Sequence, residues 1–140
     1  MYNYEYPRAA LTVDAIVFVK ENKSTYILLI QRGNEPFKNM WALPGGFIEM
    51  NETLETACKR ELAEETGLQV KKMTQFKTYD AINRDPRHRT ISVAFFIELN
   101  QQKTVKGGDD AARAEWFPIS DLPELAFDHA QILNDFFENR

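Results

Sequence analysis

Hydrophobic positions in the first part of the chain fall into two extended runs. Residues 10–19 are rich in Val, Leu, Ile and Phe, and residues 26–30 repeat this composition. Both runs predict strands. The intervening residues 20–24 are polar and predict a turn, so we expect the two strands to form a hairpin.

Beyond the hairpin the pattern changes from extended to helical. Gly and Pro recur through residues 33–46, which predicts a loop, and Phe47 and Ile48 then predict a short extended piece. Residues 53–66 are the clearest helix, because an apolar residue recurs at every fourth position, at Leu54, Cys58 and Leu62. Thr53 or Asn51 can cap its first turn, and Gly67 stands where a left-handed terminal cap is expected.

The second half of the chain predicts three more strands and a second helix. In order these are a strand at 68–82, an Arg-rich loop at 83–89, a strand at 90–99, a turn at 107–110, a strand at 115–119 and a helix at 128–138. This order predicts an α/β fold, a mixed sheet with helices on both faces. Because the sequence has no repeat and no low-complexity linker, we expect a single domain over residues 1–140.

Composition narrows the functional class. Hydrophobic residues make up 44% and charged residues 27%, as in a soluble globular protein. The formal net charge of −4 argues against a nucleic-acid partner, because sequence-independent binding to phosphates requires a basic excess. It leaves open a small phosphate ligand that is held through a metal ion.

The single cysteine, Cys58, bears on location. It allows no intramolecular disulfide and no zinc site built from cysteines, which fits a reducing compartment. The polar, tyrosine-rich start of the chain does not resemble a signal peptide. No apolar stretch approaches the ~20 residues of a membrane span. We therefore expect a cytoplasmic protein without a membrane partner.

The predicted helix at 53–66 carries several acids on one face. Positions three and four apart share a side of a helix, so Glu61, Glu64 and Glu65 would project together, opposite the apolar stripe. Like charges at this spacing repel, and a divalent cation reverses that effect. Ligands made only of oxygen suit Mg²⁺ or Mn²⁺. The alternative is a solvated acidic face.

The surrounding segment decides between these two interpretations. It runs Gly46-Phe-Ile-Glu-Met-Asn-Glu52, then seven residues, then Arg60-Glu-Leu-Ala-Glu-Glu-Thr-Gly-Leu68. This resembles a complete Nudix box, in which Gly, five residues, Glu and seven residues precede Arg-Glu-aliphatic-any-Glu-Glu-any-Gly-aliphatic. Every defined position matches. The resemblance implies the Nudix fold, an α/β/α sandwich, and hydrolysis of a nucleoside diphosphate linked to another group.

The resemblance also implies roles for residues of the box. Glu64 and Glu65 would be the main metal carboxylates, with the carbonyl of Gly45 as a further ligand. Glu61 would be another ligand or the base for the attacking water. These residues define the expected Mg²⁺ or Mn²⁺ site.

Two further residues of the segment would support the catalytic carboxylates. Arg60 would hold one in place by a charge-assisted hydrogen bond, and Glu52 would act from the preceding loop. Outside such a motif, Arg60 would be interpreted as part of a surface salt bridge.

The flanks of the box indicate a substrate. Residues 41–46, 85–87, 107–110 and 126–129 resemble ADP-ribose pyrophosphatase-like Nudix proteins of bacteria and archaea. One position departs from that pattern. Many of these enzymes have a proline about sixteen residues after the box, where this chain has Arg84, with Pro86 two places on. The exact substrate is therefore left open.

Candidate substrate-binding residues lie outside the box. Guanidinium groups bind phosphate bidentately, so the arginines are candidates for a clamp, although charged loops are common without this role. Two loop carboxylates could reach the metal site. The candidates are Arg32, Arg84, Arg87, Arg89, Asp109 and Asp110.

Some residues have competing interpretations. Phe37, Trp41 and Tyr79 could stack on a base, but aromatic residues at such positions more often pack in the core. His129, at the start of an apolar helix, is interpreted as a packed or capping residue and not as a base. Cys58 is interpreted as packing on the apolar stripe.

Two rival functions remain. One is hydrolysis of a modified nucleoside triphosphate to the monophosphate and pyrophosphate. The other is a non-catalytic nucleotide sensor, as in Nudix-related regulators that carry a winged-helix DNA-binding domain. The 140 residues contain no such domain and no basic excess, and the box is intact, so the enzyme is favoured. The resemblance also favours a homodimer.

Overall fold

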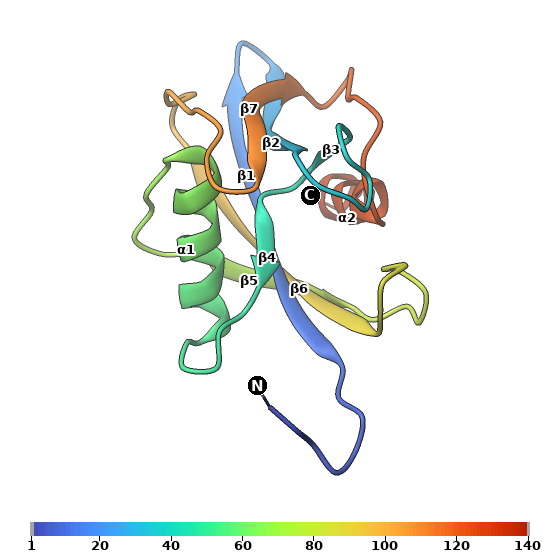
Figure 1. Cartoon of the computed structure of the whole chain (residues 1–140). Helices are drawn as coiled ribbons and strands as arrows, with labels where there is room; N and C mark the ends of the chain where they lie inside the picture. Colours follow the sequence, from blue (N-terminus) through green and yellow to red (C-terminus); the bar gives the residue numbers. More distant parts are fainter. Residues whose placement is uncertain (1, 140) are drawn as a thin grey trace.

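The computed structural model describes residues 2–139. The elements, in chain order, are β1 (Ala10–Glu21), β2 (Ser24–Arg32), β3 (Trp41–Ala42), β4 (Gly45–Phe47), α1 (Leu54–Thr66), β5 (Thr74–Tyr79), β6 (Thr90–Leu99), β7 (Ala111–Pro118) and α2 (His129–Glu138). The predicted hairpin, both helices and the strand at 90–99 are confirmed. Figure 1 shows the sheet with α1 and α2 set apart from one another.

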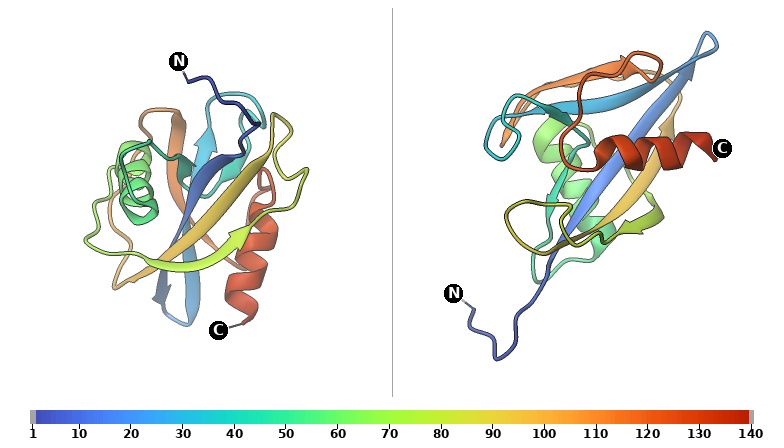
Figure 2. Two further views of the ribbon diagram at one scale, coloured as in Figure 1. Left: turned by 90° about the horizontal axis from the view of Figure 1, so that it is seen from below. Right: turned by 90° about the vertical axis from the view of Figure 1, so that its right-hand side faces the viewer.

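The two helices cover opposite faces of one mixed sheet (Figure 2). Side chains of β1 alternate between these faces, as strand geometry requires. Val13, Ala15 and Val17 belong to the core cluster that contains Cys58 and Leu62 of α1. The even-numbered Ile16 and Phe18 belong to the second cluster, which contains Ile132, Leu133 and Phe136 of α2. The predicted α/β/α sandwich is therefore confirmed.

The strands β1 and β2 diverge, and this divergence makes room for the site. They pair only near their shared turn, from Phe18 and Ile27 to Glu21 and Ser24. Further from the turn, residues 12–14 of β1 pair with β4, whereas β2 pairs with β3 and β7. On its other edge β1 runs parallel to β6. The segment from β3 to β4 therefore crosses from one diverging strand to the other.

Three predicted boundaries are corrected. The loop at 33–46 contains β3 and the start of β4, because its last residues pair with β2 and β1. The strand predicted at 68–82 is shorter, since β5 begins at Thr74. Before it, the Met73 amide donates to the Glu55 carboxylate at 3.0 Å and not to a strand. β7 begins at Ala111, earlier than predicted, because it pairs with β2 as far as Arg32.

No helix in the described residues is both long enough and apolar enough to span a membrane.

Candidate active site

Helix α1 is fixed at both ends, which sets the direction of its acidic side chains. The Thr53 side chain accepts a hydrogen bond from the Thr56 amide, and Gly67 has a φ of +77° and donates its amide to the Ala63 carbonyl. These are the predicted N-terminal and C-terminal caps. Cys58 and Leu62 are fully buried and hold the helix against the sheet. The packing interpretation of Cys58 is therefore confirmed.

Three carboxylates gather at the outer side of α1. One oxygen from each of Glu61, Glu64 and Asp109 lies within 4.8 Å of the others. Asp109 arrives from the loop before β7, and that loop packs closely against the helix. A Cβ on Gly108 would lie only 2.6 Å from the Glu64 carbonyl oxygen. Of the two loop carboxylates predicted to reach the metal site, the structure places Asp109 in the acidic cluster, and its role there stays a prediction.

Glu65 is buried and lies outside this cluster, so the prediction that it projects together with Glu61 and Glu64 is corrected. Only 7% of Glu65 is exposed, and its Oε1 accepts a hydrogen bond from the Gly45 amide at 2.8 Å. Burial raises the pKa of Glu65 to about 9, although the bond from Gly45 lowers it and nearby Glu61 adds to the rise. The carboxylate is therefore costly to ionise, unless a cation compensates.

Arg60 links the acids to one another. Its Nη2 lies 2.6 Å from Glu52 Oε1, and its Nη1 lies 2.9 Å from Glu64 Oε1 and 3.2 Å from Glu61 Oε1. Bonding to Arg60 lowers the pKa of Glu52. The predicted contacts of Arg60 and Glu52 are present, and they orient the acidic cluster.

Glu61 has the electrostatic character of a proton acceptor or a metal ligand near neutral pH. Burial raises its pKa to about 7, Arg60 opposes this change, and the charges of Glu64 and Asp109 add to it. A carboxyl group with such a pKa can take up a proton in a reaction. The donors of this cluster are all oxygen atoms, which suits Mg²⁺ or Mn²⁺ and not a soft metal.

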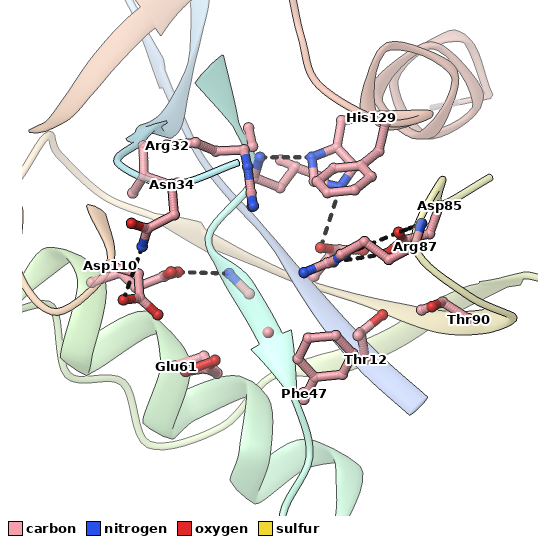
Figure 3. Close-up of a pocket in the computed structure, with 18 of the residues that line it drawn as sticks. Thr12, Arg32, Asn34, Phe47, Glu61, Asp85, Arg87, Thr90, Asp110 and His129 are labelled. Atoms are coloured by element: carbon pink, nitrogen blue, oxygen red, sulfur yellow. Dashed lines mark hydrogen bonds and ion pairs between the residues drawn. The ribbon is translucent and has the colours of Figure 1, made fainter. Parts of the chain in front are cut away.

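A pocket of about 240 Å³ opens between the diverging strands, with the acids at one end (Figure 3). Glu61, Glu65 and Asp110 line that end. The opposite, inner wall is polar and is made by β1, β6 and the start of α2. Its lining residues include Thr12, Asp14, Thr90 and His129.

The predicted arginines do not form one clamp. Arg32 and Arg87 line the pocket, and both guanidinium groups lie over the Phe127 ring, at 4.9 and 5.7 Å. Arg87 is also held by Asp85, at 2.8 and 3.0 Å, and lies 5.2 Å from the Phe47 ring. Contacts with aromatic rings and with Asp85 therefore hold these two side chains along the pocket lining.

The other two arginines are engaged elsewhere. Arg84 lines the pocket, but its side chain is only 4% exposed and its fork binds both oxygens of Asp128 at 2.6 and 2.9 Å. A buried guanidinium needs such a carboxylate partner. Arg89 donates to the Asp80 carbonyl at 2.8 Å and is not among the pocket-lining residues. The structure therefore does not bring Arg89 to the site.

The two predicted loop carboxylates divide between neighbouring positions. Asp109 joins the acidic cluster. Asp110 lines the pocket, and its carboxylate accepts a hydrogen bond from Asn34 at 3.3 Å. Gly45 lines the pocket as well. The role of its carbonyl as a metal ligand stays a prediction.

The three aromatic residues that could have stacked on a base pack against other side chains, which was the alternative interpretation of the sequence. Phe37 contacts Phe127 and Trp41 contacts Phe117, both with ring centres 4.8 Å apart. Tyr79 is buried and donates its hydroxyl to Asp135. None of the three lines the pocket, whose aromatic residues are Phe47 and Phe127. Sequence reasoning missed both, because nothing in the local pattern distinguishes them from packing residues.

Asp14 is the most informative residue that sequence reasoning missed. It is 6% exposed and accepts a hydrogen bond from the Ser92 hydroxyl at 2.5 Å. Burial raises its pKa, but contacts with His129, Ser92 and Arg84 lower it by more, so the net shift is downward. A signal was present, since a lone acid inside an apolar strand must find partners when it is buried.

His129 is buried and packed, as predicted. Its Nδ1 accepts a hydrogen bond from the Leu43 amide at 3.0 Å. Its Nε2 lies 3.4 Å from Asp14 Oδ1.

The comparisons with known proteins agree with one another. A family model described as NUDIX domain matches residues 9–136. An ADP-ribose pyrophosphatase of Methanocaldococcus jannaschii is 47% identical over 131 residues, which cover 94% of this chain and 75% of that protein. The ADPR responsive transcriptional repressor NtrR of Acinetobacter baylyi is 34% identical over 137 residues, and the chain spans only 55% of its length.

A solved structure extends this similarity to three dimensions. It is the NUDIX domain of Shewanella oneidensis NrtR complexed with ADP ribose. It superposes with a TM-score of 0.89 at 32% identity, and the match covers 98% of this chain and 94% of that domain.

Proposed function

Because the chain belongs to the NUDIX domain family, we propose that it hydrolyses ADP-ribose to AMP and ribose 5-phosphate. Water adds across the P–O–P bridge, so that one phosphate gains the water oxygen and the other leaves with the bridging oxygen. The observation that carries this proposal is the convergence of Glu61, Glu64 and Asp109 beside the pocket. The ADP-ribose pyrophosphatase of M. jannaschii, 47% identical, supports this choice of substrate.

The acidic cluster fits Mg²⁺ or Mn²⁺. We assign Glu61, Glu64, Glu65 and the Gly45 carbonyl as ligands, and add Asp109 from its position in the cluster. When bound, such ions neutralise the diphosphate and lower the pKa of a water molecule. The raised pKa values of Glu61 and Glu65 support this assignment, because a cation favours the ionised form of both groups.

The remaining residues orient the reaction. Arg60, fixed by Glu52, holds Glu61 and Glu64 in place through charge-assisted hydrogen bonds. Glu61 also accepts the proton of the attacking water, as a general base.

The pocket-facing side chains bind the substrate. Arg32 and Arg87 line the pocket and contact the phosphates or the base, and Asp110 contacts a hydroxyl group.

Two alternative functions remain. Hydrolysis of a modified nucleoside triphosphate to the monophosphate and pyrophosphate would use the same acids. The similar repressor of A. baylyi makes a nucleotide sensor the other candidate. The intact acidic set favours an enzyme over the sensor. The similarity to the ADP-ribose pyrophosphatase of M. jannaschii favours ADP-ribose over a triphosphate.

The test is a panel of nucleotides assayed with Mg²⁺ and analysed by chromatography. The proposal requires AMP and ribose 5-phosphate from ADP-ribose, as the preferred reaction. Release of pyrophosphate from a triphosphate would support the first alternative. Tight ADP-ribose binding without turnover would support the sensor.

Two expectations from the sequence stay predictions. These are the homodimer, which light scattering on the purified protein would test, and the cytoplasmic location.

A further inference from the structure

The inner wall of the pocket presents a buried carboxylate. Asp14 lies on β1, lines the cavity and has a side chain that is 8% exposed. The hydroxyl of Ser92 donates to its Oδ2, and His129 faces its Oδ1 at 3.4 Å. A carboxylate offers about four acceptor positions, so these two neighbours leave it with spare capacity toward the cavity.

His129 fixes the direction of this carboxylate. Because its Nδ1 accepts the Leu43 amide, the ring nitrogen that faces Asp14, Nε2, carries a proton. The guanidinium fork of Arg84 is bound by Asp128. Asp14 is therefore a charged acceptor held in one orientation, which is suited to a ligand that offers hydrogen-bond donors.

The position of Asp14 relative to the acids identifies the part of the ligand it meets. Asp14 is the Cα partner of Gly45 across the β1–β4 pair, and the Gly45 amide binds Glu65. Asp14 thus stands one strand away from the acidic end. In a nucleoside diphosphate, the group directly joined to the diphosphate is a sugar. The sugar, and not the base, therefore reaches Asp14 when the diphosphate lies at the acids.

Size and chemistry agree with a sugar. The cavity of about 240 Å³ is smaller than the roughly 300–1,000 Å³ of pockets that enclose whole ligands, so it holds one arm of the substrate. Thr12 and Thr90 add hydroxyl groups to the same wall. Ribose hydroxyls are recognised by a lone acidic side chain in dinucleotide-binding folds.

We propose that Asp14, oriented by Ser92 and His129, accepts hydrogen bonds from the vicinal hydroxyls of the ribose joined to the diphosphate and so selects ribose over deoxyribose. This inference rests on the proposed function, because it requires a sugar diphosphate at the site. Either ribose of ADP-ribose presents this chemistry, and the experiment distinguishes them.

The test compares kcat/KM for ADP-ribose and two analogues, one lacking the 2-hydroxyl of the adenosine ribose and the other lacking that of the terminal ribose. The wild type should lose about 10- to 100-fold on one analogue, as expected for a hydrogen bond to a charged group. That analogue identifies the ribose in the pocket. In Asp14→Asn the ratio between ADP-ribose and that analogue should fall toward one, whatever the absolute rate.

Two further variants separate recognition from folding. Ser92→Ala keeps the charge of Asp14 but removes one orienting bond, so the ratio should fall part of the way. Asp121→Asn removes an exposed carboxylate outside the pocket and should keep the wild-type ratio. If Asp14→Asn does not fold, the kcat/KM ratio of Ser92→Ala tests the inference in its place. A wild type that discriminates less than about threefold on both analogues, or variants that keep its full ratio, would overturn the inference.

Failure of the proposed function has a different signature. A wild type that does not hydrolyse ADP-ribose would reject that function. Calorimetry of the same three compounds with Mg²⁺ would then decide about Asp14. Weaker binding of one deoxy analogue to the wild type but not to Asp14→Asn would support the inference, and equal binding of all three would overturn it.

Discussion

The acidic side chains at the two ends of the pocket have different electrostatic surroundings. At the outer end, Glu61, Glu64 and Asp109 place like charges within 4.8 Å of one another, with Arg60 as their cationic partner. At the inner wall, the buried Asp14 is bonded to Ser92 and has a lowered pKa. The outer acids are thus destabilised by their arrangement, whereas the inner acid is stabilised by its partners.

This difference predicts which substitutions reduce activity and which reduce stability. A group that is held against repulsion gains from a ligand, and its removal costs activity more than folding. A group that is buried and satisfied contributes to folding, because removing a partner leaves a polar atom without its bond. Substitutions of the outer acids should therefore change activity much more than stability, whereas substitutions at the inner wall should also lower the free energy of unfolding.

The largest effect is expected for Glu64→Gln, which should nearly abolish turnover and leave the fold intact. Glu64 is a proposed metal ligand, and its side chain is 37% exposed, so its ion pair with Arg60 adds little to stability. Hydrolysis of ADP-ribose and thermal unfolding would be measured side by side, with the exposed Glu124→Gln as the control. More than about a tenth of wild-type activity, a loss of less than ~1.4 kcal/mol, would contradict the assigned role.

Gly46→Ala should come next, with a loss of about 100-fold in kcat/KM, as expected when a reacting group is misplaced by about 1 Å. A Cβ at this position would overlap the Glu61 carboxylate, so Glu61 must move. The matched variant is Gly67→Ala, where the added Cβ meets nothing within 4 Å but the φ of +77° disfavours alanine. It should lose about 1–2 kcal/mol of stability and keep its activity per folded molecule. Equal activity of the two variants would contradict this placement of Glu61.

At the inner wall, Ser92→Ala should reduce the free energy of unfolding by about 1–3 kcal/mol, because Asp14 loses its 2.5 Å hydrogen bond. Denaturant titration would measure this loss. Glu64→Gln should change the same quantity by less than about 0.5 kcal/mol. A Ser92→Ala protein as stable as wild type would remove the distinction between the two ends of the pocket.

The two ends also differ in how far the sequence predicts them. The outer acids lie mostly within residues 46–68, and helical periodicity alone brings Glu61 and Glu64 to one side. The inner wall joins residues from β1, β6 and α2, so it depends on the parallel pairing of β1 with β6. Hydrophobic periodicity identifies the strands but does not specify which of them become neighbours.

The arginine loop illustrates the same limit. Its composition predicts a phosphate clamp, yet Arg84 is bound to Asp128, which follows it by 44 positions in the sequence. Glu65 is a related case, since helical spacing alone places it with its acidic neighbours. Its burial follows from contact with Gly45, which arrives when β4 pairs with β1. These predictions failed because local sequence patterns do not show which residues far apart in the chain become contact partners.

The smallest effect expected is a pH dependence of stability that metal reverses. Without metal, the pKa values of Glu61 and Glu65 are about 7 and about 9, above their usual value of 4.5. The folded state therefore binds more protons than the unfolded state between these limits. The stabilisation is complete below pH 4.5 and is lost as the pH rises through about 7 and 9. Asp14 and Asp85 have lowered pKa values, so their contributions change only in acid, outside this window.

Thermal unfolding in EDTA should therefore show Tm falling between about pH 4.5 and pH 9, most steeply below about pH 7, where both groups contribute. Added Mg²⁺ should raise Tm more at the upper end, because the ion binds the deprotonated carboxylates. Glu61→Gln removes the group whose pKa is about 7, so its Tm should fall less between about pH 4.5 and pH 7 and should respond less to Mg²⁺. The Ser92→Ala protein should keep the wild-type pH dependence while unfolding at a lower temperature throughout. If Tm in EDTA rose with pH over this range, Glu61 and Glu65 would not have raised pKa values in the folded protein. The electrostatic difference between the outer acids and Asp14 would then be contradicted.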